Sequence, residues 1–287
     1  MLAVVRSSTP AHAADTPARG AEHKLEQLRA HLRSYGSCLV AYSGGVDSAF
    51  LAYVAHQVLG DHALAVIADS PSLPRRELDD ALAVAERFGF RVRRIRTGEL
   101  DDTRYAANPP NRCYFCKHEL FTQLAPIAQA EGFAVLAYGE NASDIGDHRP
   151  GAQAAGEFQV HVPLKDVGLT KTEIRQLSAA LDLPTADKPQ MACLSSRVPY
   201  GERVTPEKLR MIEDAEAVLR DLGFYDVRVR HHELSAGPLA RIEIGLDELT
   251  TFASSGVAAR VAAALRQLGY QHVTLDLQGY RRGSLNT

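Results

Sequence analysis

The ten residues from Ala41 to Phe50, AYSGGVDSAF, decide the fold. They follow the apolar residues 38–40, which are typical of a buried strand, and they lead into an apolar helix pattern that ends at Gly60. A strand that turns sharply into a helix begins a parallel strand–helix–strand unit. The small polar turn therefore lies at the sheet edge where α/β proteins bind their ligands.

The turn itself is suited to hold a phosphate group. Gly44 and Gly45 let the backbone adopt conformations closed to other residues and approach a ligand closely. Backbone N–H groups and the positive end of the following helix attract an anion. Ser43 and Ser48 add hydroxyl donors, and Asp47 is suited to hold Mg²⁺. The turn is not a Walker A loop, because no lysine precedes Ser48.

Strand and helix patterns alternate along the first two thirds of the chain, which predicts an α/β fold with a parallel sheet. The predicted strands are 62–70, 91–97, 133–141 and 158–164, and the predicted helices are 75–90, 114–132 and 170–184. A different order follows and predicts a smaller α+β domain. Its elements are a helix at 206–224 with Thr205 as N-cap, strands at 225–232 and 239–245, a helix at 257–270 and a strand at 272–279.

The chain of 287 residues is longer than one core usually covers, so we expect more than one domain. We interpret 1–21 as a disordered tail and 22–190 as the α/β domain. Residues 191–204 form an active-site loop and linker in this interpretation, and 205–287 form the α+β domain.

The composition limits the classes of protein to which this chain can belong. The formal net charge is −3 and no long basic run occurs, so a large nucleic-acid footprint is not expected. No apolar stretch approaches the roughly 20 residues that span a bilayer. We therefore expect a cytoplasmic protein without a nucleic-acid or membrane partner, whose four cysteines stay reduced.

The four cysteines differ in their surroundings. Cys38 lies inside an apolar strand and is expected to be a core residue. Cys113 and Cys116 form a C-x-x-C pair after a Pro-Pro loop, and Cys193 lies in ACLSSRVPYG. A C-x-x-C pair supports zinc, a redox disulfide or an iron–sulfur cluster. Three thiolates without a fourth suit a 4Fe–4S cluster with one open iron, while a zinc site and simple packing of the pair stay open.

The segment SGGVDS, residues 43–48, resembles the PP-loop of the ATP pyrophosphatases. That resemblance implies a Rossmann-like fold of the adenine nucleotide alpha hydrolase type, in which the turn holds the β- and γ-phosphates of ATP. Members of that superfamily cleave ATP between the α- and β-phosphates, adenylate a substrate and release pyrophosphate.

Other residues at the same sheet edge are candidates for the nucleotide site. The resemblance implies that Asp69 and Ser70, at the end of the second strand, contact the adenosine. The candidates after the strand at 133–141 are Gly139 for ATP, Asn141 and Asp144 for the nucleotide side of the site, and Asp147 and Arg149 beyond them.

Further motifs make the resemblance more specific. In chain order they are RCYFCK, GENASD, DHRPG, ACLSSRVPYG, VRVRHH and VTLDLQGYRRG. Together with SGGVDS they resemble the LarE family of ATP-dependent sulfur transferases over nearly all of the chain from residue 22 onward. The resemblance implies a homo-oligomer that adenylates pyridinium-3,5-biscarboxylic acid mononucleotide. Sulfur insertion would then give the thiocarboxylate precursor of the nickel-pincer nucleotide, the cofactor of lactate racemase.

The resemblance assigns Cys193 as the catalytic residue. In some members the matching cysteine gives up its own sulfur and becomes dehydroalanine. Members with two further cysteines, like Cys113 and Cys116, are thought to carry a 4Fe–4S cluster that passes on a sulfide. Both sulfur sources stay open for this chain. A thiolate nucleophile needs nearby positive charge or a metal, and Arg197 is four residues away. Arg197, Asn141 and Asp144 are also predicted to bind the substrate.

Two arginines in the last third of the chain are predicted to bind a phosphate. The strand pattern puts Arg228 and Arg230 on one face, and two guanidinium groups on one face form a phosphate clamp. The resemblance implies that the phosphate is the substrate's. We interpret Glu216 and Glu243 as ordinary surface acids rather than contacts of a metal or substrate.

Three other functions fit parts of the pattern. A PP-loop tRNA thiolase also uses several cysteines, but it would bind RNA with a steep salt dependence. An ammonia-using amide synthase of the NAD synthetase type needs no cysteine. A nucleotide-binding module without enzymatic activity would release no pyrophosphate.

Overall fold

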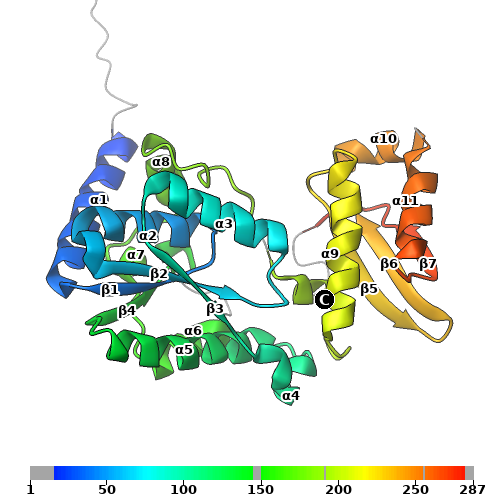
Figure 1. Ribbon diagram of the computed structural model, residues 1–287. Helices are drawn as coiled ribbons and strands as arrows, with labels where there is room; N and C mark the ends of the chain where they lie inside the picture. Colours follow the sequence, from blue (N-terminus) through cyan, green and yellow to red (C-terminus); the bar gives the residue numbers. More distant parts are fainter. Residues whose placement is uncertain (1–15, 145–149, 191, 255, 282–287) are drawn as a thin grey trace, which may run out of the picture.

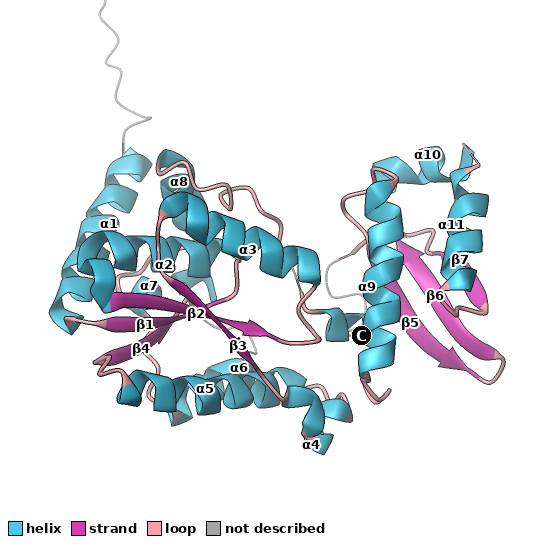
Figure 2. Ribbon diagram, in the orientation of Figure 1, coloured by secondary structure: helices cyan, strands magenta, loops and turns pink. Residues whose placement is uncertain are grey.

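The computed structural model describes residues 16–144, 150–190, 192–254 and 256–281 (Figure 1). Two sheets organise this part of the chain (Figure 2). The first is parallel throughout and has the order β3-β2-β1-β4. Its strands are β1 (Cys38–Tyr42), β2 (Ala63–Asp69), β3 (Val92–Arg96) and β4 (Val135–Tyr138). The predicted α/β fold with a parallel sheet is confirmed.

Alternate residues of the central strand enter two different cores. Cys38, Val40 and Tyr42 pack beneath one helical layer, whereas Leu39 and Ala41 face the other. The first layer contains α1 (Thr16–Tyr35), α2 (Val46–Leu59), α3 (Arg75–Phe88) and α8 (Lys171–Ala180), and the second contains α5 (Arg112–Ala130) and α6 (Pro150–Glu157) (Figure 1). Helices on both faces explain why the strand is continuously apolar.

The second sheet is smaller and mixed. Its order is β5-β6-β7, with β5 (Arg228–Leu234) antiparallel to β6 (Gly237–Glu243) and β7 (His272–Leu275) parallel to β6. The helices α9 (Pro206–Asp221), α10 (Leu249–Ser254) and α11 (Val257–Gln267) complete this part. The side chain of Thr205 caps α9 by accepting a hydrogen bond from the N–H of Lys208, as predicted.

A third apolar cluster joins the two parts. It contains Tyr105 from α4 (Thr103–Ala106), Leu194 and Val198 from the segment that carries Cys193, and Leu209 and Ile212 from α9. The segment after Cys193 forms a short 3₁₀ helix, η4 (Leu194–Arg197). The loop with Cys193 is therefore packed between the two sheets' helices.

Two expectations need correction. The strand predicted at 158–164 is reduced to one bridge between His161 and Ala137, because Gln159 has a positive φ of 53° and Pro163 begins the short helix α7 (Pro163–Asp166). The first helix begins at Thr16, inside the range predicted as a tail. The rest of that predicted tail, 1–15, lies outside the described residues, as do Asp147 and Arg149. No helix of the described ranges is both long and apolar enough to cross a membrane.

Candidate active site

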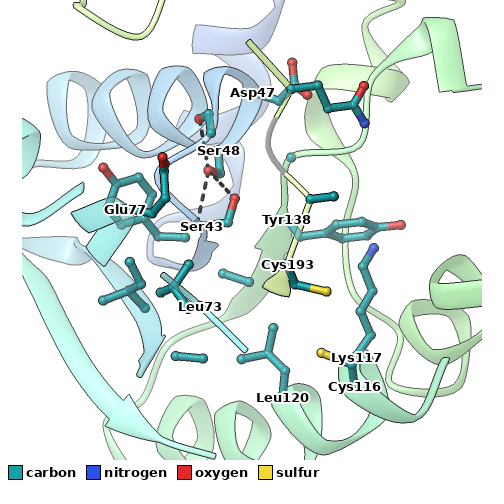
Figure 3. A pocket seen from close by; sticks show the side chains of 18 of the residues that line it. Ser43, Asp47, Ser48, Leu73, Glu77, Cys116, Lys117, Leu120, Tyr138 and Cys193 are labelled. Atoms are coloured by element: carbon teal, nitrogen blue, oxygen red, sulfur yellow. Dashed lines mark hydrogen bonds between the residues drawn. The ribbon is translucent and has the colours of Figure 1, made fainter. Parts of the chain in front are cut away.

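A cavity of about 630 Å³ opens at the carboxyl ends of β1, β2 and β4. Ten of the residues predicted for the site line it. They are Ser43, Gly45, Asp47, Ser48, Ser70, Cys116, Gly139, Asn141, Asp144 and Cys193. The structure thus brings together the glycine turn, the end of β4 and two of the three cysteines (Figure 3).

The glycine turn is held in shape by its own two serines. The hydroxyl of Ser48 accepts a hydrogen bond from the N–H of Ser43 at 3.1 Å, and it lies 3.0 Å from the hydroxyl of Ser43. Gly139 packs so closely on the turn that an added Cβ would lie 2.9 Å from the backbone nitrogen of Ser48. The turn and the end of β4 therefore pack closely against each other.

Gly44 does not line the cavity but determines the turn. Its φ is +72°, and an added Cβ would lie 2.6 Å from the Cβ of Ala81. We expect Gly44→Ala to lower stability by about 1–3 kcal/mol and to weaken ATP binding at least tenfold. Titration calorimetry with ATP and thermal unfolding measure the two effects.

Gly36→Ala is the matched control for this prediction. Gly36 has nearly the same φ, +71°, but nothing lies within 4 Å of an added Cβ. Its replacement should therefore cost only the backbone strain and leave ATP binding unchanged. Equal effects of both variants on ATP affinity would contradict the role of the turn.

Acid–lysine pairs flank the turn on both sides. Lys171 Nζ donates to Asp47 Oδ2 at 2.8 Å, and Lys188 Nζ lies 2.7 Å from Glu77 and donates to the carbonyl of Gly44 at 3.2 Å. Both lysines line the cavity. They can neutralise the charge of a triphosphate.

One carboxylate oxygen of Asp47 is available to bind a ligand. Asp47 Oδ1 is buried and has no hydrogen-bond partner among the described residues, while Oδ2 receives Lys171 and, at 3.3 Å, Asn141. An oxygen ligand of this kind fits Mg²⁺, which prefers one or two carboxylates together with phosphates. The sequence-predicted magnesium ligand thus has a suitable position.

The three cysteines of interest lie near one another at the first turn of α5. Cys116 and Cys193 line the cavity, and Cys113 is exposed beside them. Burial raises the pKa of Cys116, and the charges of Glu99, Cys193 and Cys113 raise it further. Within the described residues, no group of three or more cysteine, histidine, aspartate or glutamate side chains forms a ready metal site.

Cys38 is apart from this group. It is fully buried in β1, and burial raises the pKa of its thiol to about 12. The prediction of a core cysteine is confirmed.

Arg112, which the sequence analysis missed, places its guanidinium beside the thiol of Cys193. Its Nη2 lies 4.0 Å from the sulfur of Cys193, and its Nη1 donates to the carbonyl of Ser195 at 2.9 Å and to the side chain of Asn108. Arg112 immediately precedes Cys113, the first cysteine of the C-x-x-C pair. That position in the sequence could have indicated its place near the thiols.

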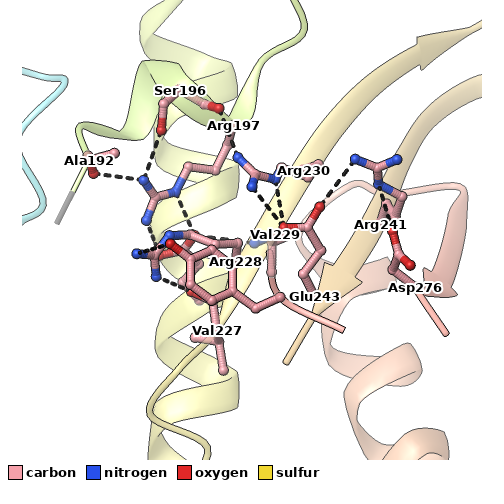
Figure 4. Close-up of polar contacts among 12 residues, drawn as sticks. Ala192, Ser196, Arg197, Val227, Arg228, Val229, Arg230, Arg241, Glu243 and Asp276 are labelled. Carbon is pink, nitrogen blue, oxygen red and sulfur yellow. Dashed lines mark hydrogen bonds and ion pairs between the residues drawn. The ribbon is translucent and has the colours of Figure 1, made fainter. Parts of the chain in front are cut away.

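Arg197 is engaged inside the protein rather than pointing into the cavity. It is fully buried, its Nε and Nη2 donate to Glu216 at 2.8 and 3.1 Å, and its Nη1 donates to the carbonyls of Ala192 and Cys193 at 2.7 and 3.1 Å (Figure 4). It therefore fixes the backbone of the loop that carries Cys193.

Arg228 and Arg230 share a face of β5 near the same loop. Arg230 forms an ion pair with Glu243 at 2.7 Å and donates to the carbonyl of Ser196 at 3.0 Å (Figure 4). Arg228 lies over the ring of Tyr280, 4.6 Å from its centre. Neither arginine lines the cavity as it stands.

Glu216 and Glu243 are not surface acids, which corrects the sequence interpretation. Both side chains are completely buried, each among arginines. Asp69 is also placed away from the cavity, because its carboxylate pairs with Arg75 and Arg94.

A triangle of buried hydroxyls links the loop to the sheet edge. Ser72, Tyr105 and Ser195 lie 2.7 to 2.9 Å apart, and the N–H of Leu194 donates to the carbonyl of Ser72 at 2.8 Å. Ser72 follows β2 and lines the cavity. The loop with Cys193 is thus anchored directly to the segment that borders the ATP side.

Comparison with known proteins agrees with this architecture. Residues 22–112 match the NAD synthase family model. A pyridinium-3,5-bisthiocarboxylic acid mononucleotide synthase from Lactiplantibacillus plantarum is 35% identical over 264 residues, which are 92% of this chain and 94% of that protein.

The chain belongs to the family of that synthase. An uncharacterized protein of Synechocystis is 45% identical over 92% of this chain and 97% of its own length. One of the subunits of the glutamine-hydrolysing GMP synthase of Methanopyrus kandleri is 26% identical over 71% of this chain and 69% of its own length. The family is thus one of PP-loop synthases that use ATP.

Proposed function

We propose that the protein adenylates pyridinium-3,5-biscarboxylic acid mononucleotide and replaces a carboxylate oxygen with sulfur. One observation carries the proposal: the PP-loop turn and the thiols of Cys116 and Cys193 line a single cavity. A carboxylate in that cavity can meet the α-phosphate from one side and a sulfur donor from the other. The relative from Lactiplantibacillus plantarum is named for the bisthiocarboxylic acid product of this chemistry.

The first step forms an acyl adenylate. A carboxylate oxygen of the substrate attacks the α-phosphorus of ATP, and the bond to the bridging oxygen breaks to release pyrophosphate. Lys171 and Lys188 stabilise the charge that develops on the leaving pyrophosphate. Mg²⁺ held through Asp47 would act as a Lewis acid on the phosphate oxygens.

The second step forms the carbon–sulfur bond. A sulfur anion attacks the activated carbonyl carbon, and AMP leaves with the former carboxylate oxygen. If Cys193 is the donor, its Cβ–S bond must then break with loss of the Cα proton, which leaves dehydroalanine. A 4Fe–4S cluster bound through Cys113, Cys116 and Cys193 would instead supply a sulfide from outside the polypeptide.

In this proposal the two parts of the chain bind different ligand groups. Residues 22–190 bind ATP, 205–287 hold the substrate's phosphate, and the loop 191–204 carries Cys193 between them. Arg228 and Arg230 are the proposed phosphate ligands, since their guanidinium groups share one face of β5 next to that loop. Arg197 is better suited to position the loop than to bind substrate, because Glu216 and two loop carbonyls occupy its N–H groups.

Anaerobic turnover tests the function and the sulfur source together. With ATP and the biscarboxylic acid mononucleotide, we expect pyrophosphate and a product heavier by the replacement of oxygen with sulfur. Iron and acid-labile sulfide near one cluster per chain, lost in Cys113→Ala, would support the cluster. A spent protein lighter by one H₂S and free of iron would identify Cys193 as a single-use donor.

The rival functions give different results in the same assay. An ammonia-dependent amide product without any need for cysteine would replace this proposal with an amide synthase. Sulfur transfer to tRNA but not to the mononucleotide would replace it with a tRNA thiolase. Absence of pyrophosphate with every acceptor would leave only nucleotide binding.

A further inference from the structure

Among the described residues, no cation is paired with one buried carboxylate that lies beside the cysteines. Glu99 begins the short 3₁₀ helix η2 (Glu99–Asp101) after β3, lines the cavity and is only 2% exposed. Three other acids that line the cavity are each paired with a lysine. These pairs are Asp47 with Lys171, Glu77 with Lys188 and Glu140 with Lys165.

The partners of Glu99 are two neutral hydroxyls. Thr97 Oγ1 donates to Glu99 Oε2 at 2.8 Å, and the hydroxyl of Ser70 donates to Oε1. In the described ranges of the chain, Glu99 forms no ion pair. A charge buried without a counter-ion is unfavourable for folding. A residue that lowers stability in this way at the wall of a cavity is explained if a ligand supplies the missing charge.

We propose that Glu99 binds the positively charged ring of the pyridinium substrate, an inference that rests on the proposed function. The ring nitrogen carries the ribose and has no hydrogen, so it can be recognised only by charge and by the faces of its ring. A carboxylate whose oxygens already accept two hydroxyls still offers its full charge. Tyr138, Phe121 and Leu120 line the same cavity and suit a flat ring.

The opposite charge lies on the same wall. Lys117 follows Cys116, lines the cavity, and places its Nζ 4.2 Å from the centre of the Tyr138 ring (Figure 3). Its stem packs on Gly151, where an added Cβ would come within 2.6 Å of Lys117 Cδ. A cationic ring that carries carboxylates would therefore contact both Glu99 and Lys117. Both residues lie next to the thiols of the cavity.

The test distinguishes recognition of the ring's positive charge from recognition of its shape. Two ligands are compared by calorimetry: the pyridinium biscarboxylic acid mononucleotide and an isostere whose ring carries no positive charge, because a 3,5-dicarboxyphenyl group replaces the pyridinium. Wild-type protein should prefer the cation by about tenfold or more. Glu99→Gln, which keeps the shape of the side chain, should bring the ratio of the two affinities close to one and leave the KM for ATP unchanged.

Thermal unfolding provides a second measurement with a matched control. Glu99→Gln removes an unbalanced charge and should keep or raise the Tm of the free protein. Glu140→Gln removes a buried acid from the same cavity but leaves Lys165 unpaired, so it should lower the Tm.

Several results would overturn the inference. These are equal affinity of the wild type for both ligands, an unchanged preference in Glu99→Gln, or a raised KM for ATP, which would make Glu99 a nucleotide ligand. The proposed function is judged separately by pyrophosphate release. A wild type that prefers the cation but releases no pyrophosphate would contradict the function and support the binding site.

Discussion

Replacing Cys193 with serine is expected to lower sulfur insertion by at least about 10³-fold while pyrophosphate release changes little. Adenylation needs only the substrate carboxylate, the α-phosphate and the groups around the PP-loop, and none of these depends on the sulfur of Cys193. The serine hydroxyl occupies nearly the same space, but it has no sulfur to supply. The two half-reactions should therefore separate cleanly in one variant.

The measurement follows pyrophosphate with a coupled assay and the thiocarboxylate by mass spectrometry. Cys38→Ala is the control, because Cys38 is the cysteine buried in the core of β1, away from the cavity. It should keep sulfur insertion and lose about 1 kcal/mol of stability from the truncated side chain. A Cys193→Ser protein that still makes thiocarboxylate at the wild-type rate would refute the role of Cys193.

The parallel sheet and the glycine turn at its edge could be predicted from short-range patterns. A strand buried on both faces is continuously apolar, as in Cys38–Tyr42, and a covering helix such as α3 repeats its apolar residues with a helical period. Gly44 is required by a backbone conformation within the turn itself, so its signal is also local.

The charged partners of the site could not be predicted in this way. Lys171 is 124 positions from Asp47, and Arg112 is 81 positions from Cys193. A lysine or arginine that meets its partner only after folding has the same local pattern as one on the surface. The sequence therefore predicted which strands and turns border the cavity. It did not predict which charged residues pair with one another there.

Glu216 had a signal that was overlooked. In α9 the buried residues Leu209, Ile212 and Leu219 lie on one helical stripe, and Glu216 occupies the position between the last two. An acid on an apolar stripe is buried, and a buried acid needs a cation. The same reasoning, applied to the sequence alone, predicts that Glu216 is buried beside a cation, but it does not identify Arg197 as that cation.

We expect Glu216→Ala to lower the free energy of unfolding by about 3–5 kcal/mol. The carboxylate accepts hydrogen bonds from Arg197, from Arg220 at 2.9 Å and from the N–H of Val229 at 3.2 Å, and it is completely buried. Its loss leaves the buried guanidinium of Arg197 without a counter-ion. Urea denaturation at neutral pH measures the effect, and Asp214→Ala, an exposed acid on the same helix, should change stability by less than about 0.5 kcal/mol.

The stabilisation should also depend on pH in a defined direction. Burial alone would raise the pKa of Glu216, but the charge and hydrogen bonds of Arg197 and the charges of Arg220 and Arg228 hold that pKa below its usual value of 4.5. A group whose pKa is lowered by folding stabilises the protein above its unfolded pKa, and the contribution is lost as pH falls through the folded pKa. The difference in stability between wild type and Glu216→Ala should therefore shrink below pH 4.5 and be constant near neutrality.

The same variant tests whether the second part of the chain positions the loop with Cys193. Arg197 holds the carbonyls of Ala192 and Cys193 only while Glu216 orients its guanidinium. Under conditions where Glu216→Ala stays folded, sulfur insertion should fall more than adenylation. The double variant Arg197→Met with Glu216→Leu should regain part of that stability, because an apolar pair replaces the ion pair while Arg220 and the N–H of Val229 still lose their acceptor. It should not regain sulfur insertion, because no donor remains for the two carbonyls; recovery of both properties would show that the ion pair is only a packing element.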